Sequence, residues 1–327
     1  IDLSGVTRLD TAGAWIIDRA RQELAAAGAS VAYEGASPAH ATLIAEAEYR
    51  VFETAERHAP GPLIGFLSDI GLSVVAFGRD LAHGVEFLGQ VVRAIGVALL
   101  NPSHIRLASL VHHLENFGFR SVPIIALISF LVGAIVAQQG IFQLQNFGAT
   151  HFAVDLVGLI ALRELGVLLA AIMMAGRSGS AITAEIGSMK MREEIDAMRV
   201  MGLDPVELLI APRILSLMIA LPMLTFIADM AAIFGALIVS VTYGGLSPEI
   251  FFARLRTAIG LNTFLVGLIK APFMALVTGI IASVEGLDVQ GSAESLGRQV
   301  TASVVKAIFM VILVDGLFAM FFAAIKY

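Results

Sequence analysis

The sequence contains no cysteine and little charge. Of its 327 residues only 15% are charged and 57% are hydrophobic, whereas soluble domains carry charge on about a quarter of their residues. This composition excludes an ordinary cytosolic enzyme and predicts a membrane protein. The absence of cysteine excludes disulfides, thiolate metal sites, iron–sulfur clusters and cysteine nucleophiles.

The chain also lacks an excess of positive charge. It has 21 Lys and Arg against 27 Asp and Glu, a net charge of -6, so it has no global basic field and we expect no nucleic-acid partner. His112 and His113 have no third His beside them and are expected to be interfacial polar residues rather than metal ligands, so we expect no metal site. The phosphate-binding pattern Gly-x-x-x-x-Gly-Lys-Ser/Thr is absent as well, and we expect the chain to bind no ATP by that route.

The distribution of charge divides the chain into three zones. Residues 1–58 have the composition of a soluble domain, residues 59–120 are amphipathic, and residues 121–327 form an apolar membrane domain. Within the last zone we predict five spans. Their approximate ranges are 122–142, 156–176, one long tilted helix within 214–248, 261–284 and 304–325.

The basic residues predict the orientation of the spans. The segment between the second and third spans holds Arg177, Lys190, Arg192, Arg199 and Arg213, whereas the segment between the first and second holds no Lys or Arg. By the positive-inside rule the former segment is cytoplasmic. We therefore expect the N-terminal region in the cytoplasm and, after an odd number of spans, the C-terminus in the periplasm.

A repeating apolar pattern precedes the first span. Between residues 79 and 100, apolar residues recur every three or four positions and polar residues occupy the other face, which is typical of an amphipathic helix. We expect this helix to lie in the cytoplasmic membrane interface; the alternative is that it packs against the soluble domain. The predicted apolar stripe comprises Leu81, Val85, Leu88, Val92, Ile95 and Leu99.

The first 58 residues predict a small α/β unit. Residues 1–6 and 30–33 are typical of strands, and residues 14–27 are typical of a helix ended by Gly28. The stretch DLSGVTRLDTAG at 2–13 resembles the STAS domain, which implies docking of a protein partner and makes Thr11, after Asp10, a candidate phosphorylation site. The alternative is that the Thr11 hydroxyl simply caps the helix. The early strands of such a domain are missing and the chain begins with Ile1, so we expect the natural start to lie upstream.

The segment 175–205 joins the second and third spans. Small residues at its start favour close helix contacts, and a charged helix follows that Gly202 and Pro205 end. A short amphipathic helix on the cytoplasmic side would let a soluble motor push on the membrane domain. The alternative is a solvated connecting helix whose internal ion pairs contribute only about 0.3–0.5 kcal/mol each.

Several motifs together resemble one family. The runs LRELG at 162–166, AGRSGSAITAEIG at 175–187, EEIDAM at 193–198, MGLDP at 201–205 and APR at 211–213 are similar to those of the MlaE (YrbE) family of ABC-transporter permeases. These permeases move phospholipids between the membranes of diderm bacteria. The resemblance extends over about residues 60–327, and a STAS protein is an accessory subunit of the bacterial Mla complex.

The resemblance implies a transporter of the bacterial inner membrane rather than an enzyme. It implies a homodimer, two copies of an MlaF-like ATPase that carries the ATP and magnesium, and an MlaD-like hexamer of MCE-domain subunits on the periplasmic face. Residues 185–201 would be the coupling helix in the ATPase cleft. The coupling residues that it implies are Glu185, Glu193, Glu194, Asp196, Met198, Arg199 and Met201.

Five charged residues interrupt the predicted spans: Arg163, Glu164, Asp229, Lys270 and Asp315. Charges at bilayer depth cost about 2.5–3.5 kcal/mol each, so they should face the bundle interior and find partners. Adjacent helical residues point about 100° apart, so Arg163 and Glu164 cannot both face one pore. In the resemblance Glu164 lines a lipid pocket with Arg163 nearby, Lys270 and Asp315 match charged positions, and Asp229 matches none. The alternative is a structural ion network between helices.

We expect the apolar part of a lipid pocket at the dimer interface, between the first two spans and the fifth. Its predicted lining residues are Leu131, Ile135, Phe142, Leu159 and Leu162. A second hypothesis is an ion-coupled anion transporter, because STAS domains also accompany sulfate-type carriers, although those need more spans in inverted repeats. A membrane-embedded enzyme is disfavoured because the sequence shows no activated Ser and its His residues are scattered.

Overall fold

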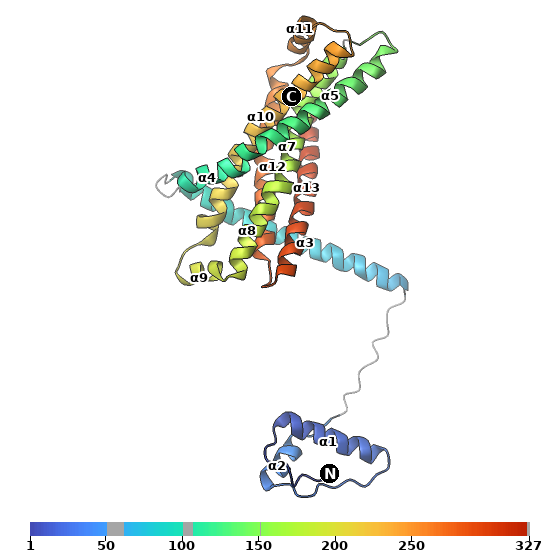
Figure 1. Cartoon of the computed structure of the whole chain (residues 1–327), viewed down its shortest axis with the longest axis vertical. Coiled ribbons are helices and arrows are strands. Elements are labelled where there is room, and N and C mark those ends of the chain that lie inside the picture. Colours follow the sequence, from blue (N-terminus) through green and yellow to red (C-terminus); the bar gives the residue numbers. More distant parts are fainter. Residues whose placement is uncertain (51–61, 101–106, 151, 326–327) are drawn as a thin grey trace. The chain divides into compact units, whose positions relative to one another are not determined.

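The computed structural model describes residues 1–50, 62–100, 107–150 and 152–325. It divides into two compact units, Ile1–Leu72 and Ser73–Tyr327. Within the described residues all regular elements are helices (Figure 1). The domain boundary predicted between residues 58 and 59 lies outside the described residues.

The N-terminal unit contains the helices α1 (Thr11–Ala26) and α2 (Pro38–Glu46) and the first residues of a long third helix. The carboxylate of Asp10 caps α1 by accepting a hydrogen bond of 2.8 Å from the Gly13 N–H. Thr11 is therefore the first helical residue, and the alternative that its hydroxyl caps the helix is wrong. Its side chain is exposed.

The strands predicted in this unit are not formed in the described residues. Residues 1–6 and 30–33 are extended only in part, and one isolated parallel bridge joins Asp2 to Glu34. Its hydrogen bonds run from the Leu3 N–H to the Glu34 carbonyl and from the Glu34 N–H to the Ile1 carbonyl. A strand needs a ladder of such bonds, and two short segments provide too few. The predicted α/β class of this unit is therefore not supported, and its small core instead joins Leu3 with Ala14 and Ile44 of the two helices.

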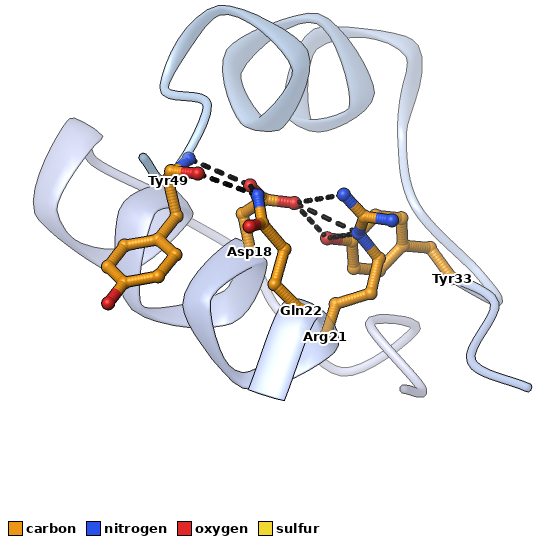
Figure 2. Close-up of polar contacts among 5 residues, drawn as sticks. All are labelled: Asp18, Arg21, Gln22, Tyr33 and Tyr49. Atoms are coloured by element: carbon orange, nitrogen blue, oxygen red, sulfur yellow. Dashed lines mark hydrogen bonds and ion pairs between the residues drawn. The ribbon is translucent and has the colours of Figure 1, made fainter. Parts of the chain in front are cut away.

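The carboxylate of Asp18 ties together three parts of this unit (Figure 2). It accepts hydrogen bonds from the Tyr49 N–H (2.8 Å), the Tyr33 hydroxyl (3.0 Å) and, on α1 itself, Gln22 Nε2 (3.0 Å) and Arg21 Nε (2.9 Å). Burial acts to raise the pKa of Asp18, but these hydrogen bonds to the charged form outweigh it and hold the pKa below its usual value.

The Asp18 network predicts an acid-sensitive N-terminal unit. Because the folded pKa lies below the unfolded one, ionised Asp18 stabilises the unit above the unfolded value of about 3.9, and the stabilisation is lost as the pH falls through the folded pKa. We expect Asp18→Asn to lower the free energy of unfolding at neutral pH by about 1–3 kcal/mol and to weaken its acid dependence. Trp15 is the only tryptophan of the sequence and stacks edge-on against Tyr49, so its fluorescence reports on this unit in urea titrations of the full chain.

The matched control is Glu23→Gln, which removes an exposed ion pair with Arg19 on the same helix. Exposed pairs contribute about 0–1 kcal/mol, so this control should stay close to the unsubstituted chain. Equal effects of the two substitutions would contradict the role of Asp18.

In the second unit, five helical stretches of the described residues are long and apolar enough to cross a membrane, which agrees with the predicted number. They are Leu107–Gln145, Phe152–Met191, Val206–Thr242, Leu261–Leu287 and Ala293–Ala324. The first comprises α4 (Leu107–Phe117), the short helix η2 (Phe119–Ser121) and α5 (Val122–Gln145). The second comprises α6 (Phe152–Ile160), η3 (Ala161–Leu165), α7 (Gly166–Met174), η4 (Ala175–Gly179) and α8 (Ser180–Met191). The third comprises η5 (Val206–Ile210) and α10 (Ala211–Thr242), and the last two are α12 and α13.

Glycines bring neighbouring spans into backbone contact. A Cβ added at Gly133 of α5 would overlap the backbone of Ala232 on α10, and one at Gly235 of α10 would overlap the Phe130 carbonyl. Helices in lipid associate by such close packing of small residues. The pair α5 and α10 therefore lies side by side along the bundle (Figure 1).

The segment 175–205 differs from its predicted form. The second helical stretch does not end near Gly176 but continues through η4 and α8 to Met191. The predicted coupling helix 185–201 is broken at Glu193, whose φ of 59° is left-handed, and α9 (Glu194–Val200) follows. After this turn, Ile195 of α9 is buried in the main core.

The amphipathic zone forms the long helix α3 (Pro62–Leu100). Of the predicted stripe, Leu88 and Ile95 pack against the core of the second unit, together with buried Phe87, Val91 and Ala94. Val85 and Val92 are exposed, because the buried face is rotated relative to the predicted stripe. The side chains of Leu81 and Leu99 lie outside the described residues. The second half of α3 thus packs on the membrane-spanning unit, a partner that neither alternative had included.

A further helix, α11 (Pro248–Ala258), lies between the third and fourth spans, and it was not among the predicted elements. It lies at the opposite end of the bundle from α9 (Figure 1). Arg254 of α11 pairs with Asp155 of α6 at 3.7 Å. This pair joins α11 to the second helical stretch.

Candidate functional site

Four of the five charged residues inside the spans meet around Lys270 of α12 (Leu261–Leu287). Lys270 Nζ lies 2.5 Å from Glu164 Oε2 and 3.1 Å from Asp315 Oδ1, and it donates to the Arg163 carbonyl at 3.3 Å. Glu164 Oε1 also lies 3.6 Å from Arg163 Nε. Asp315 comes from α13 (Ala293–Ala324), so the cluster joins the second, fourth and fifth spans.

The backbone of η3 places this cluster. The segment is a π-helix in which the Gly166 N–H bonds to the Ala161 carbonyl, and such insertions recur at functional sites. Gly267 lies so close to η3 that an added Cβ would stand 2.5 Å from the Leu162 carbonyl. Lys270 follows Gly267 by about one turn on the same helix face, and the close approach lets its side chain reach the Arg163 carbonyl.

The four side chains differ in exposure. That of Lys270 is 0% exposed, while those of Arg163 and Glu164 are 23% and 31% exposed. Asp315 is more buried than Glu164. Lys270 is thus the buried centre of a formally neutral cluster, and Arg163 and Glu164 are the members that a ligand could contact.

The five apolar residues predicted to line a lipid pocket do not all lie on the same part of the structure. Leu131 and Ile135 lie one turn apart on the exposed face of α5, and Phe142 and Leu159 are also exposed. Leu162 is buried against α12 beside the charged cluster. Four of the five therefore lie on the surface of this chain, and Leu162 belongs to its interior.

The predicted coupling residues separate into two groups. Glu185 lies on α8 and pairs with Arg213 at the start of α10 at 3.1 Å, so it belongs to the bundle. Glu194 pairs with Arg192 at 3.0 Å, and Asp196 pairs with Lys190 (3.2 Å) and Arg199 (3.3 Å). Asp196 thereby fixes α9 to α8 across the left-handed turn at Glu193.

The C-terminal end of α9 carries an exposed apolar surface that the predicted coupling residues include only in part. Val200 is 89% exposed and Met201 is 66% exposed, and Leu203 is exposed beside them. Of these three residues, only Met201 is among the predicted coupling residues. The three apolar residues around Gly202, in an otherwise polar segment, are the sequence pattern from which this surface could have been predicted.

Among the described residues, no group of three or more His, Asp or Glu residues could hold a metal ion. The fifth charged residue of the spans, Asp229, is fully buried, and its carboxyl group has no hydrogen-bond partner among the described residues.

The Lys270 cluster predicts a large effect of neutralising its centre. Lys270→Met would remove the cation that Asp315 contacts and leave Glu164 with only its longer pair to Arg163. Removing one partner of a buried pair costs about 3–5 kcal/mol. We expect a marked fall in the thermal unfolding midpoint of the protein in lipid nanodiscs. Adding Glu164→Gln and Asp315→Asn to that variant should restore much of the loss.

A surface pair provides the control. Arg192→Met removes an exposed partner of Glu194 and should change stability by no more than about 1 kcal/mol. A Lys270→Met protein as stable as this control would show that the cluster does not hold the spans together.

Comparison with known proteins identifies the family. The sequence model of the family described as Permease MlaE matches residues 110–321. The chain is 32% identical over 257 residues to the intermembrane phospholipid transport system permease protein MlaE of Haemophilus influenzae, covering 77% of this chain and 95% of that protein. It is 28% identical to a probable ABC transporter permease protein of Rickettsia typhi (77% and 95% covered) and 29% identical to the chloroplastic protein TRIGALACTOSYLDIACYLGLYCEROL 1 of Arabidopsis thaliana (72% and 65% covered). The chain therefore belongs to the MlaE permease family.

Proposed function

We propose that this chain is the membrane permease of an ABC transporter that moves phospholipids between the bacterial inner membrane and a periplasmic MCE-domain protein. The observation that carries the proposal is the charged cluster around Lys270, set within five membrane-spanning stretches of a chain in the MlaE family. The related protein of Haemophilus influenzae is named as a phospholipid transport permease.

In this proposal the lipid head group meets Arg163 and Glu164, whose side chains are partly exposed at bilayer depth. The acyl chains contact the exposed apolar face of α5, where Leu131 and Ile135 lie. A second copy of the chain closes the pocket, since this face is uncovered in the single chain. Lys270 and Asp315 hold the two head-group residues in place, and no covalent step is involved.

The energy comes from a separate MlaF-like ATPase that carries ATP and magnesium. We infer that it docks on α9, where Val200 and Met201 offer apolar contacts beside the charges of Glu194 and Asp196. The helical stretch Phe152–Met191 connects that end with Arg163 and Glu164, so movement of α9 is transmitted to the lipid site. In this proposal α9 and the N-terminal unit lie in the cytoplasm, and the C-terminus lies in the periplasm.

The N-terminal unit is, in this proposal, a docking module for a protein partner. Thr11 is exposed at the start of α1, where phosphorylation of its hydroxyl would add negative charge at a helix N-terminus. The alternative of an ion-coupled anion transporter depended on the STAS resemblance, and no observation on the described residues favours it.

The docking proposal predicts that charge at the tip of α9 uncouples transport. Val200→Asp, or the charge reversals Glu194→Lys and Asp196→Lys, should lower ATP-dependent lipid transfer at least about tenfold, a change that corresponds to about 1.4 kcal/mol of lost interaction. Membrane insertion should be unchanged. The measurement is transfer of labelled phospholipid to the MCE-domain protein in proteoliposomes, together with co-purification of the ATPase.

Phe147→Asp is the control for these variants, because Phe147 is also an exposed apolar residue (81%, against 89% for Val200) but follows the C-terminal end of α5. It should leave co-purification of the ATPase intact. Full transfer activity and normal ATPase binding in the α9 variants would refute the coupling assignment.

The head-group proposal predicts different effects for the two carboxylates of the cluster. Glu164 is more exposed than Asp315, although both contact Lys270. We therefore expect Glu164→Gln to change the amount of phospholipid that copurifies with the complex by at least about twofold, and Asp315→Asn to change it less. Quantitative lipid mass spectrometry measures both, and unchanged lipid content in Glu164→Gln would place the head group elsewhere.

A further inference from the structure

Asp229 is an ionisable residue of the membrane domain that has no role in the proposed transport mechanism. It lies near the middle of α10 and is 0% exposed. Neither oxygen of its carboxyl group has a hydrogen-bond partner among the described residues. Buried polar groups almost always have partners, so a group without one requires an explanation.

The carboxyl group of Asp229 lies against a glycine. A Cβ added at Gly166, the first residue of α7, would overlap Asp229 Oδ1, so the absence of a side chain at 166 makes room for the carboxyl group. The residues that flank this contact, Val167 on α7 and Ala228 and Ala232 on α10, are buried and apolar. The carboxyl group is therefore packed closely between α7 and α10, next to buried apolar residues.

A hydroxyl group without a partner lies on the neighbouring helix. Ser129 of α5 is fully buried, and its Oγ also has no hydrogen-bond partner among the described residues. Along the contact between these spans Gly118 lies beside Ala220 and Gly133 beside Ala232. This register places Ser129 at about the level of Asp229.

The positively charged side chains of η3 and α12 pair with carboxylates other than that of Asp229. The spans α5 and α7 contain no charged residue at all. On η3 and α12, Arg163, Glu164 and Lys270 contact one another, and Lys270 also contacts Asp315. The other titratable or charged groups on α10 and on the helices that contact it are Glu207, Arg213, His112, His113, Glu115, Asp155, Glu249, Arg254, Arg256 and Glu285.

These remaining groups lie toward the ends of the spans or have partners of their own. Arg213 pairs with Glu185, Arg254 with Asp155, and Glu285 with Lys306. An ionised carboxylate at Asp229 would therefore have lost its hydration without compensation, which is strongly unfavourable at bilayer depth. A metal cation would need several oxygen ligands, and the described residues provide no metal-binding group.

We propose that Asp229 is a proton-binding site of the permease, occupied at neutral pH so that the side chain is a neutral carboxylic acid. The bound proton allows α7 to pack against α10 at Gly166. Loss of the proton would place an uncompensated negative charge in this contact, directly beside the helix that joins the Lys270 cluster to α8. The packing of that helix is thereby linked to protonation.

Infrared spectroscopy of the intact permease complex in lipid nanodiscs tests the proposal. The unsubstituted protein should show, at neutral pH, a carbonyl stretching band of a protonated carboxyl group that shifts in heavy water and that Asp229→Asn lacks. Asp155→Asn, which removes a carboxylate already paired with Arg254, should retain the band. Identical spectra for the unsubstituted protein and Asp229→Asn would overturn the proposal.

A second measurement does not depend on the folding of the variant. Labelling the unsubstituted protein with carboxyl-13C aspartate should shift the same band, and the absence of a shifted band would overturn the proposal. The thermal unfolding midpoint should fall by several degrees as the pH rises from about 3.9, the pKa of an unfolded Asp, towards the pH at which Asp229 of the folded state releases its proton, because over this range the folded state holds a proton that the unfolded state has lost. Asp229→Asn should remove this part of the pH dependence. A midpoint that instead depends on sodium, potassium or calcium only when Asp229 is present would show a metal site and refute the proton site.

Discussion

The buried ammonium group of Lys270 constrains the rest of the membrane domain. It has no exposed surface and contacts a carboxylate from the second span, a carboxylate from the fifth span and a backbone carbonyl of η3. Because each of these groups would be costly to leave unpaired in an apolar interior, the three spans cannot slide past one another without breaking several contacts together. The residues proposed to meet the lipid head group are therefore held by the same interaction that orders the bundle.

Small residues make that interaction geometrically accessible. Gly267 allows α12 to approach η3, Gly133 and Gly235 allow α5 and α10 to touch through their backbones, and Gly166 makes room for Asp229. Helices in lipid gain little from the hydrophobic effect and depend on such close packing. In this protein the glycines also determine which polar groups meet, since a larger residue at 166 or 267 would displace the neighbouring carboxyl or carbonyl group.

The helical stretch Phe152–Met191 links the two ends of the proposed mechanism. It carries Arg163 and Glu164 in a π-helix, passes Asp229 at Gly166, and reaches the turn before α9. The Thr183 hydroxyl lies within hydrogen-bonding distance of the Ala282 carbonyl (2.9 Å) and of Ser303 Oγ (2.8 Å). These contacts fix the C-terminal part of the stretch to the fourth and fifth spans. A force applied at α9 would then act on a rigid helix rather than on a flexible loop.

The sequence by itself determined the membrane character, the number of spans and the family, because low charge, apolar runs and contiguous motifs are local properties. It also identified the four residues of the Lys270 cluster, since charges at bilayer depth need partners. Only the tertiary structure decided that Lys270 is the centre, that α3 presents a rotated face to the core, and that Glu193 breaks the predicted coupling helix. The tertiary structure also decided that the two short segments predicted as strands form, in the described residues, a single isolated bridge instead of a sheet. In each of these cases the outcome depends on which distant groups become neighbours, and the periodicity of one segment contains no information about its partner.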